Sequence, residues 1–209
     1  MHCQSAPSCV ALGTVRAVGS GRASTVLSLD DTRVLRLGGR PGYEAEVMAH
    51  ARAVGFPVPE VHEIRDDGLV LERVHGPTML DDLRRRPWRL HAHARLLARL
   101  HERLHAIPWE GETLLHLDLH PDNVLLSPNG PVVIDWTNAR GGLAPLDLAL
   151  SWLIAVTSGG RAGRAFGRFF LGAVDPDEVA GALPDAAAFR LADPNVTAGE
   201  RDAVRAVLS

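Results

Sequence analysis

Lysine is missing from the sequence: all 22 basic residues among its 209 residues are arginines. This absence excludes mechanisms that need a lysine amine, namely the Walker A lysine of a P-loop, a Schiff base and a serine–lysine dyad. A coding bias toward G and C explains the absence better than selection for arginine as such. Where other proteins use lysine to bind phosphate, this chain has arginine.

Cysteine, net charge and long apolar runs are also scarce. The two cysteines, Cys3 and Cys9, form neither a disulfide framework nor a zinc knuckle, so we expect a cytoplasmic location. A formal net charge of −3 argues against broad nucleic-acid binding, which requires a basic face. The longest apolar stretch, 143–157, contains Asp147 and is too short to span a bilayer, and the N-terminus lacks the pattern of a signal peptide.

The composition that remains is ordinary for a globular protein, with 46% hydrophobic residues in a length that suits one domain or two small lobes. Apolar runs between turn residues predict a small antiparallel sheet in the first third, with one helix packed on it. After Gly76 the spacing becomes helical, and Thr78 with Asp81, like Thr197 with Glu200, has the spacing of a helix cap. The predicted strands cover 10–18, 25–29, 33–37, 58–64, 69–74, 124–126 and 132–134, and the predicted helices include 42–54 and 88–106.

The densest chemical motif is HLDLHPDNVLL at 116–126, followed by VVIDW at 132–136. On a tight loop, Asp118 can accept or orient the proton of an attacking hydroxyl. Asn123 offers a neutral carbonyl oxygen and Asp135 a carboxylate, and both suit Mg²⁺. Mg²⁺ screens phosphate charge while the loop holds the reactants in line. The set therefore favours phosphoryl transfer.

His-x-Asp-x-x-x-x-Asn followed by Ile-Asp-Trp resembles the aminoglycoside phosphotransferase and choline kinase branch of the protein-kinase-like fold. In that branch, such segments stand where protein kinases have Asp-Phe-Gly. The resemblance covers roughly the whole chain. It implies a two-lobed α+β fold, with a small antiparallel-sheet N-lobe carrying one helix and a mainly helical C-lobe. The implied lobes are 1–75, which binds nucleotide, and 76–209, which holds the catalytic loop and the acceptor site.

The resemblance also assigns roles to individual residues. Asp118 would be the catalytic aspartate, and Asn123 and Asp135 would hold Mg²⁺. His116 would brace the catalytic loop, and Asp147 would steady the C-terminal lobe. The donor implied is ATP, whose adenine edge would be read by the backbone of Glu72, Arg73 and Val74.

A phosphate-binding loop is predicted between the first two strands. The segment 19–26 approximates the kinase loop Gly-x-Gly-x-x-Gly-x-Val, with Gly19, Ser20 and Gly21 at its start and Ser24 at the third glycine position. Glycines let backbone amides approach phosphate closely.

The third strand departs from the family pattern, because Arg36 stands where the phosphate-binding lysine is usual. Arginine binds phosphate bidentately, but its planar fork is not a point charge. The helix partner of this cation is expected to be Glu44 or Glu46. Glu44 shares a face with the apolar Val47 and Met48, so periodicity favours it.

Two other histidine patterns suggest metal sites. His116, Asp118 and His120 could form a His-x-Asp-x-His hydrolase site, but Pro121 spoils the strand geometry that this needs. His101 and His105 have the spacing of metal ligands on a helix, yet Glu102 and Arg103 beside them favour a solvated helix face. We expect the same of His91 and His93.

The predicted activity is transfer of the ATP γ-phosphoryl group to a hydroxyl of a small molecule by a monomer or weak homodimer, with no nucleic-acid or membrane partner. Only residues 107–113 separate the long helix from the catalytic segment, so we expect a reduced acceptor pocket, and the sequence names no acceptor. A pseudokinase, binding nucleotide or acting as a scaffold without transfer, is the alternative. The missing lysine favours it, whereas the retained Asp118, Asn123 and Asp135 oppose it.

Overall fold

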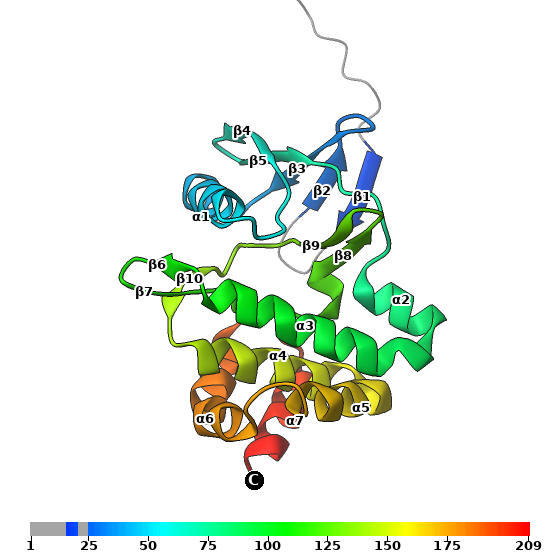
Figure 1. Ribbon diagram of the computed structural model, residues 1–209, viewed down its shortest axis with the longest axis vertical. Coiled ribbons are helices and arrows are strands. Elements are labelled where there is room, and N and C mark those ends of the chain that lie inside the picture. Colours follow the sequence, from blue (N-terminus) through cyan, green and yellow to red (C-terminus); the bar gives the residue numbers. More distant parts are fainter. Residues whose placement is uncertain (1–15, 21–24) are drawn as a thin grey trace, which may run out of the picture.

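The computed structural model describes residues 16–20 and 25–209. It has the predicted α+β class, with an antiparallel sheet in the N-terminal part and helices in the C-terminal part (Figure 1). The sheet has the order β1-β2-β3-β5-β4, and every neighbouring pair is antiparallel. Its strands are β1 (Arg16–Ser20), β2 (Thr25–Ser28), β3 (Arg33–Leu37), β4 (Val61–Arg65) and β5 (Gly68–Glu72).

Helix α1 (Pro41–Ala53) lies between β3 and β4 in sequence and packs against β4 and β5. It begins at a proline, whose missing N–H costs nothing in the first turn. The strand predicted over 58–64 begins only at Val61, because Pro57 and Pro59 have no N–H to donate to a neighbouring strand. Most of the strand predicted over 10–18 lies outside the described residues.

Helices dominate the rest of the chain, and α3 lies across the middle of the molecule between the sheet and the lower helices (Figure 1). Thr78 caps α2 by accepting from the amide of Asp81, and Thr197 with Glu200 forms a complete capping box on α7, as the spacing predicts. The helices are α2 (Met79–Arg85), η1 (Pro87–Arg89), α3 (Leu90–His105), η2 (Pro121–Asn123), α4 (Ala144–Ser158), α5 (Gly160–Leu171), α6 (Pro176–Ala192) and α7 (Ala198–Leu208). Among the described helices, none is both long and apolar enough to cross a membrane.

Two small β elements hold or flank the motif residues. The hairpin of β8 (Val124–Ser127) and β9 (Gly130–Val133) links the two halves of the motif. A second sheet pairs β7 (Glu112–Leu115) with both β6 (Pro108–Trp109) and β10 (Arg140–Gly142). In Figure 1 the β8–β9 hairpin lies between α3 and the main sheet, whereas the second sheet lies beside one end of α3, below α1.

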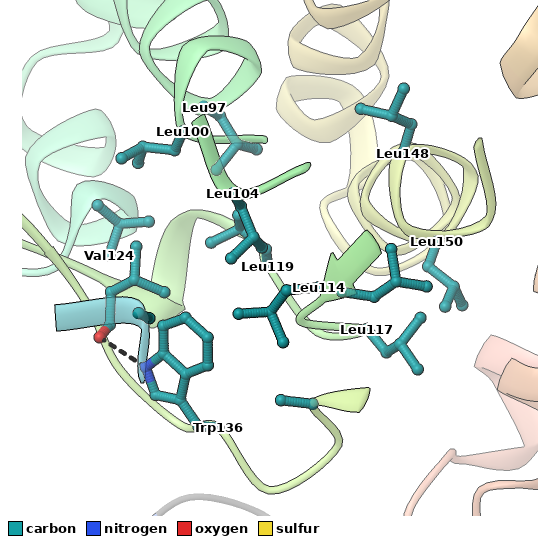
Figure 2. Close-up of a cluster of buried hydrophobic side chains, with 14 of the residues drawn as sticks. Leu97, Leu100, Leu104, Leu114, Leu117, Leu119, Val124, Trp136, Leu148 and Leu150 are labelled. Atoms are coloured by element: carbon teal, nitrogen blue, oxygen red, sulfur yellow. Dashed lines mark hydrogen bonds between the residues drawn. The ribbon is translucent and has the colours of Figure 1, made fainter. Parts of the chain in front are cut away.

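One continuous apolar core runs through both parts and surrounds the motif. Figure 2 shows leucines of α3 and α4 packed against leucines of the motif segment, with Trp136 at one side. Leu97, Leu100 and Leu104 are buried, as the helical spacing predicts. The indole N–H of Trp136 donates to the carbonyl of Val133 at 3.1 Å, which satisfies its only polar group.

Candidate active site

The loop that carries Asp118 is held from below by a buried carboxylate. Asp147, in the first turn of α4, accepts hydrogen bonds from the amides of His116 at 3.0 Å and Leu117 at 2.7 Å. Leu117 has a left-handed backbone, with φ at 61°, a conformation that costs free energy for a branched side chain. These two hydrogen bonds therefore stabilise a turn that the sequence alone disfavours. They also fix the position of the next residue, Asp118.

Asp118 is fixed at both ends of its carboxylate. The amide nitrogen of Asn123 donates to its Oδ2 at 3.1 Å and to its backbone oxygen at 2.8 Å. His120 places Nε2 at 3.5 Å from Oδ1. Because His120 Nδ1 accepts from the amide of Asp122, the imidazole proton of the neutral form sits on Nε2 and faces the carboxylate.

Charge around Asp118 outweighs its burial. Burial alone raises the pKa of this carboxyl, but the hydrogen bond from His120 and the positive charges of His120 and Arg190 hold the pKa below its ordinary value. The side chain is 24% exposed, so an incoming group can reach it. An ionised, reachable and oriented carboxylate is suited to accepting a hydrogen bond from a hydroxyl.

The two predicted metal ligands lie next to each other, because the amide of Ile134 donates to the carbonyl of Asn123 at 3.0 Å. Asn123 uses its amide nitrogen on Asp118, which leaves its oxygen for a cation. Asp135 has φ at 64°, and only its Oδ1 accepts from a described side chain, the hydroxyl of Thr137 at 2.8 Å. An amide oxygen and a carboxylate oxygen are ligands that Mg²⁺ prefers, so the donor set fits this ion.

Arg36 is connected to the same aspartate. One guanidinium branch pairs with Glu44, and the other donates to the hydroxyl of Thr137 at 3.2 Å, which in turn bonds Asp135. Glu44 is fully buried, as the face periodicity predicts, while Glu46 is exposed. Burial lowers the pKa of Arg36, and the charge of Asp135 opposes that shift.

The predicted nucleotide-binding backbone is described in part. Gly19 and Ser20 end β1, whereas Gly21 and Ser24 lie outside the described residues. Gly19 pairs with Val26, and Val26 pairs with Arg36, so the end of β1 shares one row of the sheet with the arginine.

The segment after β5 leaves one amide available. The amides of Glu72 and Arg73 donate to the carbonyls of Glu60 and Thr32, but the amide of Val74 donates to no described group. Glu72 itself is exposed, and its carboxylate accepts from the amide of Glu60 at 3.1 Å. Of the predicted adenine-reading backbone, the N–H of Val74 is therefore the donor left for a ligand.

The expectation of a solvated face is wrong for His93, His101 and His105, whereas His91 is exposed as expected. His101 is completely buried and bonds Ser151 at 2.9 Å, and His105 bonds Asp147 at 3.1 Å. His93 is also buried and bonds Asp82. The polar neighbours of these histidines in the sequence could not predict their burial, because their hydrogen-bond partners come from α2 and α4. The sequence did offer one indication of a buried polar partner, namely Asp147 inside an apolar run.

The alternative hydrolase site is not assembled. His116 is buried and its Nε2 lies 3.1 Å from the carbonyl oxygen of Ile134. Within the described part of the chain, the side chains that gather three candidate ligand atoms are His101, His105 and Asp147 instead. Thr137 and Ser151, which complete two of the hydrogen-bond networks, carry no motif signal in the sequence.

Comparisons with known proteins agree with this geometry. A family model described as "Phosphotransferase enzyme family" matches residues 77–182. A probable serine/threonine-protein kinase BUD32 homolog from Archaeoglobus fulgidus is 30% identical over 104 residues, which are 50% of this chain and 47% of that protein. The aligned part is thus about half the length of this relative.

Two solved structures share the fold. The ternary complex of streptomycin, ATP and APH(2")-IIa has a TM-score of 0.63 and 14% identity, and covers 87% of this chain and 85% of that chain. A choline/ethanolamine kinase family protein from Mesorhizobium loti has a TM-score of 0.62 and 15% identity, and covers 95% of this chain and 88% of that chain. At these identities the likeness concerns the fold.

Proposed function

The chain belongs to the phosphotransferase enzyme family, and on that premise we propose that it transfers the γ-phosphoryl group of ATP to a hydroxyl of a small molecule. The observation that carries the proposal is the joining of Asp118, Asn123 and Asp135 on one loop and hairpin, with Arg36 reaching Asp135 through Thr137. Phosphoryl transfer needs these parts: an oriented acceptor, oxygen ligands for Mg²⁺ and a cation near phosphate.

Asp118 orients the acceptor hydroxyl. Because its pKa is held below the ordinary value, it is a weak base, and it accepts the proton fully only as the hydroxyl oxygen bonds phosphorus. The bond from Asn123 and the facing His120 fix the carboxylate before the acceptor arrives. Pre-set orientation of this kind lowers the entropy that is lost on reaching the transition state.

The phosphate side belongs to the N-terminal part, which we propose as a nucleotide-binding lobe of residues 1–75, with 76–209 as the catalytic lobe. Asn123 and Asp135 would hold Mg²⁺, which screens phosphate charge when bound. Arg36, held by Glu44, neutralises phosphate charge. The glycine motif at 19–24 is proposed, from its sequence, as the loop whose amides bind phosphate.

A small-molecule acceptor is favoured by the folds that this chain matches along most of its length. One of those structures contains streptomycin with ATP, and another belongs to a choline/ethanolamine kinase family protein. A protein acceptor has the support of the alignment with the serine/threonine kinase homolog, which covers half of this chain. Arg36 in place of lysine supports the pseudokinase alternative.

The test is ADP formation from Mg-ATP with streptomycin, choline and ethanolamine as separate acceptors, and a protein acceptor such as casein beside them. We expect turnover with a small molecule. Asp118→Asn should lower kcat by about 10²–10⁴-fold without unfolding the protein, because it removes the proton acceptor. Asp122→Asn is the matched control, since this exposed residue lies in the same loop and should leave kcat unchanged.

Wild-type turnover in Asp135→Ala would contradict the metal assignment, and turnover with casein alone would contradict the small-molecule acceptor. Thermal unfolding with ATP separates binding from transfer. Ligand at a hundred times its dissociation constant stabilises by about 2.7 kcal/mol, which raises Tm by roughly 5–10 °C in a chain of this size. A Mg²⁺-dependent rise without ADP formation would favour the pseudokinase, and no rise at all would contradict nucleotide binding.

A further inference from the structure

Three buried side chains beneath the catalytic loop converge on one point. His101 and His105 are one turn apart on α3, and Asp147 approaches them from α4. Asp147 Oδ2 lies 3.6 Å from His101 Nδ1 and 3.1 Å from His105 Nε2. All three ligand atoms lie within 4.8 Å of one another. Asp118, Asn123 and Asp135 are not part of this cluster.

The hydrogen bonds of Ser151 decide which nitrogen of His101 carries the proton. The Ser151 hydroxyl donates to the carbonyl of Leu119 at 2.6 Å, so it has only lone pairs to offer His101 Nε2 at 2.9 Å. His101 therefore donates through Nε2, and in its neutral form Nδ1 is a bare lone pair. In the described part of the chain, this fully buried nitrogen has no hydrogen-bond partner.

The lone pair of His101 Nδ1 faces the carboxylate of Asp147, an arrangement that is unfavourable without a cation between them. A second proton on His101 would remove this repulsion, but burial lowers the pKa of the imidazole and favours the neutral form. A metal ion bound between Nδ1 and the carboxylate would remove the repulsion without protonation. Metal-bound histidines commonly donate their other ring nitrogen to a hydrogen-bond acceptor, as His101 does to Ser151.

We propose that His101 Nδ1, His105 Nε2 and Asp147 Oδ2 bind a Zn²⁺-type transition-metal ion. Two imidazoles and a carboxylate are a common zinc ligand set, with bonds of about 2.0–2.2 Å. Tetrahedral bonds of that length separate ligand atoms by about 3.3–3.5 Å, close to the 3.1 and 3.6 Å found here. The ion takes the place of the proton that His105 Nε2 donates to Asp147, and in the neutral imidazole that proton moves to Nδ1.

The site also has an entry path. His105 lines a cavity of about 620 Å³ that reaches solvent between α3, α5 and the start of α6. Water in this cavity can supply the fourth ligand. The ion would join α3 to α4 and hold Asp147, whose carboxylate positions the amides of His116 and Leu117. Its role is therefore to stabilise the catalytic loop from beneath, apart from the phosphoryl-transfer chemistry.

The experiment measures Zn²⁺ binding by the full chain, without any activity assay. Protein treated with a chelator is titrated with Zn²⁺ by calorimetry, and bound metal is counted by mass spectrometry. Co²⁺ replaces Zn²⁺ in a parallel sample, because tetrahedral Co²⁺ gives a strong visible absorption. We expect one ion per chain, the Co²⁺ absorption, and a Zn²⁺-dependent rise in Tm.

Two variants remove one ligand atom each and keep the other hydrogen bonds. His101→Gln preserves the donor to Ser151 but has no atom at the Nδ1 position, and His105→Asn removes Nε2. Each should weaken Zn²⁺ binding by about 100-fold or more. Loss of a residue that only orients a metal ligand already costs up to about 100-fold in affinity, and loss of a ligand itself should cost at least as much. His91→Gln is the matched control, because this exposed histidine lies on the same helix and lines the same cavity.

Each opposing outcome overturns the proposal. It is wrong if the wild-type chain binds no Zn²⁺, if His101→Gln and His105→Asn bind as tightly as the wild type, or if His91→Gln loses as much affinity as they do. Circular dichroism establishes that each variant is folded before titration. If one ligand variant does not fold, the other decides, and the Co²⁺ spectrum of the wild type is an independent readout.

Discussion

Arg36 shows how one side chain can serve two partners on different elements. Its guanidinium is planar and forked, so one branch pairs with Glu44 of α1 while the other reaches Thr137 after β9. A lysine amine is a single point and cannot hold both positions at once. The arginine therefore does more here than replace a lysine charge.

Arg36→Lys should keep the pair with Glu44 and lose the bond to Thr137. We expect the protein to fold and the KM for ATP to rise several-fold, because the cation is no longer fixed beside Asp135. Arg36→Ala leaves a fully buried carboxylate unpaired and should destabilise the protein by about 3–5 kcal/mol. Arg33→Ala, an exposed change on the same strand, should cost less than about 1 kcal/mol. Equal KM values for Arg36→Lys and wild type would contradict a role in phosphate binding.

The buried histidines predict a pH dependence of stability. Burial lowers the pKa values of His101 and His116, against the charge of Asp147, and the positive charge of His105 also lowers that of His101. In the unfolded chain these two imidazoles bind protons below about pH 6.5, where in the folded protein they stay neutral. The unfolding free energy therefore falls as pH falls from there toward the lower folded pKa values, by up to about 1.4 kcal/mol per pH unit for each imidazole.

Thermal unfolding of chelator-treated protein between about pH 7.5 and pH 5.5 measures this effect. Tm should fall toward the acid end of this range. The fall should be shallower in His101→Gln, because only His116 then takes up a proton on unfolding. His91→Gln should follow the wild type. Identical slopes for wild type and His101→Gln would mean that His101 is charged in the folded protein.

At the scale of elements, the segment from His75 to Thr78 lies beside β8 and is joined to it by an isolated bridge. The amide of Leu126 donates to the carbonyl of Pro77 at 2.9 Å, and Thr78 forms a bridge with Leu125. Gly76 has φ at 154°, and a Cβ there would overlap the carbonyl of Leu126. The connection between the N-terminal sheet and the helical part thus packs against the β8–β9 hairpin, which lies between Asn123 and Asp135 in the sequence.

Gly76→Ala should destabilise the protein by more than about 1 kcal/mol, because both the backbone conformation and the space oppose a side chain. Gly181→Ala is the matched control: nothing lies within 4 Å of a Cβ there, in the middle of α6. That change should stabilise the protein by about 0.4–1 kcal/mol. Denaturant unfolding measures both, and a neutral Gly76→Ala would contradict the tight approach to β8.

The same scale shows what the sequence could predict. The apolar stripe of α3 and both threonine caps follow from local spacing, and the structure confirms them. His101 and His105 were mispredicted because burial of a polar face depends on partners 42–50 residues away, Asp147 and Ser151. The role of Thr137 could not be predicted for the same reason, since Thr137 links Arg36 to Asp135 only when β3 lies near the segment after β9. Local pattern predicts elements and motifs, whereas networks between elements need the fold.

At the scale of the whole molecule, α1 and the segment after it join the sheet to the helical part. The Tyr43 hydroxyl accepts from the indole of Trp109, and the rings of Phe56 and Trp136 meet edge to face at 5.8 Å. The amide of Val133 donates to the carbonyl of Pro57 at 2.8 Å. The apolar core is continuous through these contacts, so the two parts are expected to unfold together.

All four tryptophans lie between residues 88 and 152, so fluorescence reports on the helical part, whereas far-ultraviolet circular dichroism reports on the whole chain. The two thermal transitions should coincide. Phe56→Ala should lower stability by about 3–5 kcal/mol, because it removes a buried ring at the junction. Separate transitions in the wild type would show that the two parts unfold independently.

The bond between Arg36 and Thr137 has a kinetic consequence. Through Thr137, this bond links β3 of the sheet to Asp135 of the motif segment. The link opposes separation of the sheet from that segment. If the chain transfers phosphoryl groups as proposed, we expect it to slow the exchange of nucleotide and to make departure of ADP, rather than chemistry, the step that limits turnover.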